Sequence, residues 1–210
     1  MLNVALTGNI AAGKSTVAEL FRRWGAVLID SDQLVREVQA PGSPVLDAIV
    51  ARFGGGILSP DGSLDRARLR TIAMADRNAR RDLEALVHPA VQERRNVLLH
   101  AAWERGAQIV INDIPLLFEA LDPGTFDAVV LVDAPEAVRL DRLTRDRGMS
   151  LEEARRAVAA QQPSATKRGW RGGPRREGPR VIDNDGDLTR LEERARAVWE
   201  ELEALGRWCA

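Results

Sequence analysis

The segment from residue 3 to residue 16, NVALTGNIAAGKST, constrains this chain more than any other. A short apolar run, Val4–Leu6, leads into a turn between Gly8 and Gly13, and a helical pattern opens at Lys14. This is the spacing G-x-x-x-x-G-K-[ST], in the strand–turn–helix setting that a phosphate-binding loop requires. The residues assigned to nucleotide binding here are Gly8, Asn9, Ala11, Ala12, Gly13, Lys14, Ser15 and Thr16.

Each residue type in this loop has a physical task in holding phosphate. Glycines let backbone N–H groups converge on phosphate oxygens, and the start of the helix adds a partial positive charge. Lys14 neutralises the outer phosphates, and the Ser15 hydroxyl can ligate Mg²⁺. A Gly/Ala turn that carries a lysine by coincidence is the alternative, but the strand before it and the helix after it argue against that interpretation.

Composition argues against several other classes of protein. The formal net charge is -1, so a general binder of nucleic acid or anionic membranes is not expected. Cys209 is the only cysteine and has no partner for an internal disulfide. No apolar run approaches the length of a membrane span, and no signal peptide precedes the first strand pattern. We expect a cytoplasmic protein without a membrane or nucleic-acid partner.

Apolar runs alternate with helical patterns along the chain, which is typical of an α/β fold with a parallel sheet and crossover helices. Residues 43–106 are mostly helical and longer than one crossover needs, so part of them is expected to form a helical subdomain. The predicted strands are Val4–Thr7, Val27–Ile29, Ile109–Ile111, Val129–Val132 and Val181–Ile182.

The last third of the chain contains three further patterns. Residues 135–162 predict two helices that meet near Gly148, with Ser150 as the N-cap of the second. Residues 163–180 are rich in Gly, Pro and Arg, which predicts an exposed, mobile loop. Residues 187–208 predict a closing amphipathic helix.

Two aspartates follow the second predicted strand, in Ile29-Asp30-Ser31-Asp32. Ligands of open α/β sheets collect at the carboxyl ends of the strands, so a carboxylate here could accept the proton of an attacking hydroxyl. The same residues are good caps for a helix that begins near Gln33, and Asp30 with Gln33 resembles a capping box. Taken alone, these residues favour capping over catalysis.

Two more sets of charged residues follow later strands. Asp113 comes after the third, where P-loop proteins place a carboxylate that supports Mg²⁺, although it also fits a simple loop before a turn at Pro115. Arginines after the fourth strand fit either a solvated helix face or a group that stabilises charge on a transferred phosphoryl group. These arginines are Arg139, Arg142, Arg145 and Arg147.

Further short motifs follow in a fixed order. They are Ala5–Gly8, Gly13–Thr16, Ile29–Asp32, Pro41-Gly42, Phe53-Gly54, Asp61–Arg66, His88-Pro89, Pro115–Glu119, Arg142-Leu143, Gln161 and Asp183–Gly186. The phosphate loop alone is generic, whereas His-Pro and Pro-Leu-Leu-Phe-Glu combined with the Asp-x-Asp turn are far more specific. In this order the motifs resemble those of the dephospho-coenzyme A kinases over nearly the whole chain.

The resemblance implies a P-loop NTPase fold: a five-stranded parallel sheet flanked by helices, a helical substrate-binding region and a lid. It also implies a kinase that uses ATP and Mg²⁺ to phosphorylate the ribose 3′-hydroxyl of dephospho-coenzyme A, the last step of coenzyme A synthesis. Within a single domain, 1–210, the core would comprise about 1–42, 107–134 and 179–210. The acceptor-binding helices would be about 60–106 and the lid about 142–178.

The same resemblance implies residue roles, and it reverses the preference for capping at Asp32. This residue would be the general base, while Lys14 and Arg142, with Arg147 or its rival Arg145, would stabilise the transferred group. Ser15 and Asp113 would hold Mg²⁺, and Asn184 would contact the nucleotide. The substrate-binding residues would be Asp32, His88, Pro115 and Leu117.

The chain departs from the family pattern at two places. Family members usually have Gly where this chain has Asn9 and Ala11, and Pro179-Arg180 stand where Ala-Asp usually precedes the last strand. Phosphate binding is expected to be kept, because the two loop glycines, Lys14 and Ser15 are intact. The alternatives are a P-loop kinase for another small acceptor, such as a nucleoside monophosphate or shikimate, and a non-catalytic nucleotide switch.

Overall fold

The computed structural model describes residues 1–172 and 177–208, and the chain divides into two compact units. The first unit contains residues 1–29 and 102–210, and the second contains residues 30–101. Cys209 and residues 173–176 of the predicted loop lie outside the described part of the chain. Within the described part, no helix is both long and apolar enough to cross a membrane.

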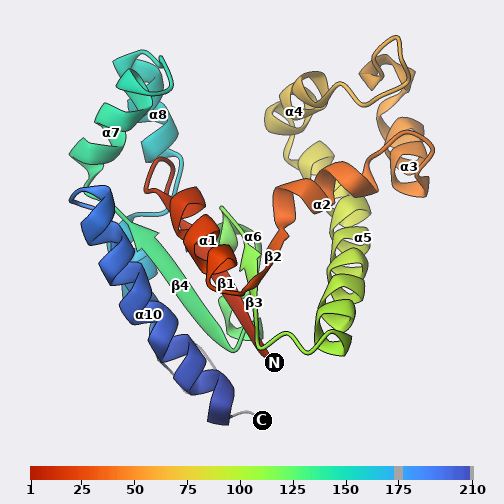
Figure 1. Cartoon of the computed structure of the whole chain (residues 1–210). Coiled ribbons are helices and arrows are strands. Elements are labelled where there is room, and N and C mark those ends of the chain that lie inside the picture. The colour runs from red at the N-terminus through yellow and green to blue at the C-terminus, as the bar shows by residue number, and fades with distance from the viewer. Residues whose placement is uncertain (173–176, 209–210) are drawn as a thin grey trace. The chain divides into compact units, whose positions relative to one another are not determined.

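A five-stranded sheet in the order β2-β3-β1-β4-β5 forms the centre of the first unit (Figure 1). Its registered pairs are parallel, and β1 lies between β3 and β4: Leu6 pairs with Asp113 on one side and with Val130 on the other. All five predicted strands are confirmed. They are β1 (Leu2–Gly8), β2 (Val27–Asp30), β3 (Ile109–Asp113), β4 (Ala128–Asp133) and β5 (Arg180–Asp183).

Alternating side chains of the central strands bury both faces of the sheet, as expected when successive residues point to opposite sides. Leu2, Val4 and Leu6 of β1 pack in one core cluster with residues of α1 (Lys14–Arg23) and α10 (Leu188–Trp208). Ala5, between them, packs on the other side with Phe126 and Val129. The phosphate loop therefore directly follows a strand that is buried on both faces and hydrogen-bonded along both edges.

The remaining helices of the first unit follow β3 and β4 along the chain. They are α6 (Leu117–Ala120), the 3-10 turn η2 (Pro123–Thr125), α7 (Glu136–Arg145), α8 (Leu151–Ala159) and α9 (Ser164–Gly169). The two predicted helices around Gly148 and the closing helix are confirmed as α7, α8 and α10. The prediction of a loop over 163–180 is wrong for residues 164–169, because α9 forms there and its Lys167 is fully buried.

Helices make up nearly all of the second unit, as predicted for residues 43–106. They are α2 (Ser31–Val38), α3 (Pro44–Phe53), the 3-10 turn η1 (Gly55–Ile57), α4 (Arg66–Ala75) and most of α5 (Arg77–Glu104). This unit has a core of its own, to which Leu46 and Ile49 of α3, Leu69 of α4 and Val87 of α5 contribute. Each unit therefore buries its own apolar side chains.

Candidate functional site

The predicted phosphate loop connects the end of β1 to the start of α1. Gly8 ends the strand so close to β4 that a Cβ would lie 2.6 Å from the Val132 carbonyl oxygen. Gly13 stands at the N-cap of α1 with φ of 99° and has no side chain to cap the helix. A helix start without a capping side chain offers backbone N–H groups and a positive dipole end to an anion. Ser15 and Thr16 are exposed in the first turn of α1.

Lys14 forms an ion pair with Asp113, the last residue of the neighbouring strand β3. Both side chains are largely buried, with 15% and 12% of their surfaces exposed. Because β1 and β3 are parallel neighbours, the loop lysine and the strand-end carboxylate reach the same edge of the sheet. The sequence predicted both residues for the site, and the structure brings them together.

Arg142 of α7 and Asn184 support the second half of the loop. The Asn184 amide Nδ2 donates to the Ala12 carbonyl oxygen at 2.8 Å. Arg142 donates to the Ala11 carbonyl oxygen at 3.1 Å and to Asn184 Oδ1 at 3.1 Å. Two residues from distant parts of the chain, both predicted for the site, thus hold two successive carbonyl groups of the loop.

Ala11 is the only non-glycine residue in the described ranges with a positive φ, at 59°. The left-handed region costs an ordinary L-residue roughly 1–2 kcal/mol, because Cβ crowds the carbonyl oxygen. Strain of this kind persists only where the surroundings hold the backbone in place. The Arg142 hydrogen bond to the Ala11 carbonyl oxygen is one such restraint.

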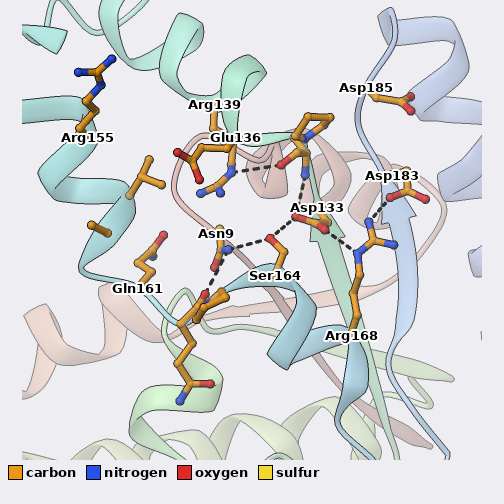
Figure 2. A pocket seen from close by; sticks show the side chains of 16 residues that line it. Asn9, Asp133, Glu136, Arg139, Arg155, Gln161, Ser164, Arg168, Asp183 and Asp185 are labelled. Atoms are coloured by element: carbon orange, nitrogen blue, oxygen red, sulfur yellow. Dashed lines mark hydrogen bonds and ion pairs between the residues drawn. The ribbon is translucent and has the colours of Figure 1, made fainter.

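The first half of the loop contacts the segment that follows α8 (Figure 2). Asn9 is buried, and its Nδ2 donates to Ser164 Oγ at 3.1 Å and to the Gln162 carbonyl oxygen at 3.4 Å. The Ile10 backbone N–H donates to Gln161 Oε1 at 2.7 Å. These hydrogen bonds place the Asn9 side chain and the Ile10 backbone against the segment 161–164.

The same hydrogen-bond network continues to the ends of β4 and β5. Ser164 Oγ donates to Asp133 Oδ1 at 2.7 Å, and Arg168 Nε donates to Asp133 Oδ2 at 2.7 Å. Arg168 also pairs with Asp183, which lies opposite Asp133 in the strand register. Burial would lower the pKa of Arg168, but its bonds to Asp183 and Asp133 outweigh this and raise it.

These residues line one side of a cavity of about 460 Å³ between the end of β4, α7, α8 and α9 (Figure 2). Sequence reasoning missed Asp133, Ser164 and Arg168 as parts of the site. A usable signal was present for Asp133 and Asp183, because both are acidic residues at the ends of predicted strands. No pattern in the sequence indicated that α9 would supply their partners.

Three other predicted site residues of the first unit have different environments. Pro115 accepts a hydrogen bond from Thr7 Oγ1 at 3.3 Å through its carbonyl oxygen. Leu117 is fully buried beside Phe126, so its side chain cannot contact a substrate directly, whereas the adjacent Leu116 is 46% exposed. Arg147 is exposed after α7.

The remaining predicted residues lie in the second unit. Asp30 is the N-cap of α2, and its Oδ1 accepts from the backbone N–H groups of Asp32 at 2.8 Å and Gln33 at 3.1 Å. Asp32 is exposed in the first turn, and within the described ranges its carboxylate has no hydrogen-bond or ion-pair partner. Capping therefore occupies the side chain of Asp30 and leaves that of Asp32 available. His88 is exposed on α5.

The oxygen donors at the loop fit a Mg²⁺ ion. Mg²⁺ prefers oxygen ligands and is commonly held by one or two protein groups together with substrate phosphates. The Ser15 hydroxyl is exposed at the start of α1, and the Asp113 carboxylate lies at the end of β3. Among the described residues, no group of three or more His, Cys, Asp or Glu side chains could form a cage made of protein alone.

A parallel sheet whose central strand leads into a lysine-bearing phosphate loop, with basic side chains following β4, defines a P-loop kinase. The Dephospho-CoA kinase family profile matches residues 2–190. Dephospho-CoA kinases of Streptomyces avermitilis and Thermobifida fusca are 45% and 42% identical to the chain. These alignments cover 96% of the chain and 94% of the first relative, and 97% of the chain and 97% of the second.

Solved structures share the fold of this chain. A crystal structure from Thermus thermophilus superposes with a TM-score of 0.75 at 34% identity, over 95% of this chain and 96% of that one. The Dephospho-CoA kinase from Campylobacter jejuni shares the fold, with a TM-score of 0.68 at 21% identity over 96% of each chain. The chain belongs to the dephospho-CoA kinase family.

Proposed function

We propose that the chain transfers the γ-phosphoryl group of ATP to the ribose 3′-hydroxyl of dephospho-CoA, giving CoA and ADP. Membership of the dephospho-CoA kinase family over residues 2–190 is the observation that carries this proposal. The intact phosphate loop, with Lys14 and its partner Asp113, supports it. A cytoplasmic location, expected from the sequence, is part of this proposal.

ATP phosphates would bind at the start of α1. Backbone N–H groups of the loop and the Lys14 ammonium are the groups that can neutralise phosphate oxygens there. Lys14 would then exchange part of its contact with Asp113 for the phosphates. Ser15 and Asp113 are the residues that would hold Mg²⁺. When bound, that ion neutralises charge on the phosphate oxygens.

Asp32 is the proposed general base. The acceptor hydroxyl oxygen forms a bond to the γ-phosphorus, the bond from that phosphorus to the β–γ bridging oxygen breaks, and the hydroxyl proton goes to the Asp32 carboxylate. ADP leaves with the bond electrons. An exposed carboxylate without a partner in the described ranges suits this task, while Asp30 caps the helix.

Arg142 and Arg147 are the proposed lid arginines that stabilise charge on the phosphoryl group. Arg142 already contacts the loop at the Ala11 carbonyl oxygen. Arg145, the rival of Arg147, is bonded to Asp146 at 2.9 Å and to Asp141 at 3.1 Å, contacts that raise its pKa and partly neutralise its charge. Arg147 has no such partner among the described residues, which favours it over Arg145.

The test is ATP-dependent conversion of dephospho-CoA by the purified protein. We expect mass spectrometry to detect one added phosphate group and an equal amount of ADP, and ³¹P NMR to place that group on the ribose 3′-oxygen. Nucleoside monophosphates and shikimate, offered separately, should release ADP far more slowly. Rapid ADP release with one of those acceptors, and none with dephospho-CoA, would overturn the proposal.

A further inference from the structure

We propose that Asn9 is a positioning residue for the nucleotide. Through Ser164 and Asp133, its side-chain amide holds the first half of the phosphate loop in the conformation that receives ATP. The inference rests on the proposed function only in that the loop binds ATP phosphates. It assigns Asn9 a role through its contact with α9.

The direction of the hydrogen bonds follows from the partners. Ser164 Oγ gives its single proton to Asp133 Oδ1 at 2.7 Å, so it accepts from Asn9 Nδ2 at 3.1 Å. The Gln162 carbonyl oxygen, the second group that Nδ2 meets at 3.4 Å, can only accept. Both contacts therefore fix the same orientation of the Asn9 amide, with its nitrogen toward the segment 161–164.

Asp133 makes this contact rigid. It is buried at the end of β4, and both its carboxylate oxygens are bonded: Oδ1 to Ser164 and to the Ala134 N–H at 2.9 Å, Oδ2 to Arg168 at 2.7 Å. Arg168 also bonds to Asp183 on β5. The Asn9 amide is therefore tied, through one hydroxyl group, to two strands of the sheet.

Stability alone does not account for the amide. Asn9 is 4% exposed, and its Oδ1 has no hydrogen-bond partner among the described groups. A buried polar atom without a partner lowers stability, and a smaller residue would avoid that cost. The adjacent Ile10 N–H is held by Gln161 Oε1, so two successive loop residues are fixed by the same segment.

Loss of this restraint should weaken ATP binding more than it slows the chemical step. A loop that is already ordered loses less entropy when phosphates bind. Once ATP is bound, its phosphates restrain the loop themselves, so kcat depends less on the tether. A positioning role therefore predicts a higher Kd and KM for ATP, with kcat and the KM for dephospho-CoA nearly unchanged.

The test compares Asn9→Ala, Ser164→Ala and the double variant. We expect each single variant to raise the Kd of MgATP, measured by calorimetry, about five- to tenfold, the size typical of one lost hydrogen bond. The KM for ATP should rise in parallel, while kcat stays within about threefold. The double variant should bind MgATP no more weakly than the weaker-binding single variant, because both changes remove the same contact between Asn9 and Ser164.

Two controls separate positioning from general loss of structure. Ser164→Thr keeps the hydroxyl at a residue that lines the cavity, so ATP binding should stay near the wild-type value. Thr125→Ala removes an exposed hydroxyl bond to the Asp122 carbonyl oxygen in the same unit and should leave ATP binding unchanged.

Unchanged ATP affinity in both single variants, or strictly additive losses in the double variant, would overturn the inference. An equal loss in Ser164→Thr would do the same. Calorimetry of ATP binding needs no acceptor. If the protein binds ATP but does not convert dephospho-CoA, the proposed function is refuted, and the ATP affinities of the variants still decide the role of Asn9. If wild type binds no ATP, both proposals fall. If Asn9→Ala does not fold, the two Ser164 variants decide.

Discussion

Individual residues of the phosphate loop adopt conformations that ordinary side chains avoid. Gly13 has φ of 99°, and a Cβ built there would clash with Asn184 Nδ2. Ala11, with φ of 59°, pays a steric penalty that glycine would not. The family resemblance implies that alanine is unusual at this position, but the restraint from Arg142 comes from a helix 131 residues away and has no local signal.

Gly13→Ala is expected to raise the KM for ATP at least about tenfold. The new Cβ must displace the Asn184 amide, which holds the Ala12 carbonyl oxygen at 2.8 Å, and the loop would lose that support. Steady-state kinetics with varied ATP measure the effect.

Gly25→Ala is the matched control. Its φ of 108° imposes a similar backbone cost, but nothing lies within 4 Å of the added Cβ. It should lower stability by about 1–2 kcal/mol and leave the KM for ATP unchanged. Equal effects of the two variants on the KM would show that backbone strain, and not the contact with Asn184, matters.

Asp32→Asn should reduce turnover of dephospho-CoA about a hundredfold or more and leave ATP affinity intact. The amide of the new asparagine cannot accept the hydroxyl proton. ATP affinity should be kept because the contacts of the phosphate loop do not involve residue 32. A coupled ADP assay and ATP calorimetry give the two readings. Asp47→Asn removes an exposed charge from the first turn of α3 and should change neither. Near-normal turnover of Asp32→Asn would refute its role as base.

Capping and catalysis were both possible interpretations of the aspartates after β2. Asp30 caps α2, which the local pattern indicated. The contact of Asn9 with Ser164 could not be predicted, because it joins residues 155 positions apart and depends on where α9 packs. Single-residue signals identify chemistry within a loop, whereas supporting side chains depend on tertiary placement.

Among the elements, α8 follows local rules closely. Ser150 is its N-cap, and Ser150 with Glu153 forms a reciprocal capping box: the Ser150 N–H donates to Glu153 Oε2 at 2.9 Å, and the Glu153 N–H donates to Ser150 Oγ at 3.2 Å. The sequence predicted this start because all the partners lie within four residues. Hydrogen bonds from the Ser150 hydroxyl and N–H lower the pKa of Glu153 below 4.5.

The charge of Glu153 should therefore stabilise α8 only when the carboxylate is ionised. A lowered folded-state pKa contributes stability above the unfolded value, and this contribution is lost as pH falls through the folded value. The stability difference between wild type and Glu153→Gln should be full above pH 4.5 and shrink below it. Urea unfolding at a series of pH values measures this.

Glu152→Gln removes the same charge from the same turn without touching the capping box, and so corrects for the helix dipole. A difference between wild type and Glu153→Gln that does not change with pH would contradict the capping role of the carboxylate.

The short helix α9 shows where local rules fail. Glycine, proline and arginine dominate residues 163–180 and favoured a loop, but Lys167 is buried and forms a 2.8 Å ion pair with Glu119. A helix of six residues is not stable by itself, and tertiary contacts must stabilise it. Those contacts come from Glu119, before β4, and from Asp133 and Asp183 at the ends of β4 and β5, so composition alone could not indicate the helix.

At the scale of the whole molecule, the sheet was predictable because its central strands β1, β3 and β4 are mostly apolar runs buried on both faces. Strand order was not visible in those runs, since it depends on pairing between distant segments. Among the described residues, separate core clusters lie around the sheet and among α3, α4 and α5. Helical periodicity indicated a subdomain but not its boundaries at residues 30 and 101.

Trp199→Ala tests the independence of these cores. Trp199 of α10 is 4% exposed and packs 5.5 Å from Phe21 between ring centroids, so its removal should cost the first unit about 3–5 kcal/mol. Hydrogen exchange of Ile49 and Val87 in the second core should stay slow, while exchange across the sheet accelerates.

Trp103→Ala is the control, because this side chain is 61% exposed. It should lower the free energy of unfolding by well under half as much as Trp199→Ala does. If the second unit loses protection together with the sheet in Trp199→Ala, the two cores unfold as one cooperative body.

The central position of β1 has a consequence for heat tolerance. Fraying of a sheet starts at its outermost strands, here β2 and β5, whereas β1 is flanked on both sides. The phosphate loop follows β1, the strand expected to lose its hydrogen bonds last. As the temperature rises, the support that Asn184 gives the loop from the end of β5 should be lost before Lys14 changes position. Affinity for ATP should therefore decline in stages and not in a single step.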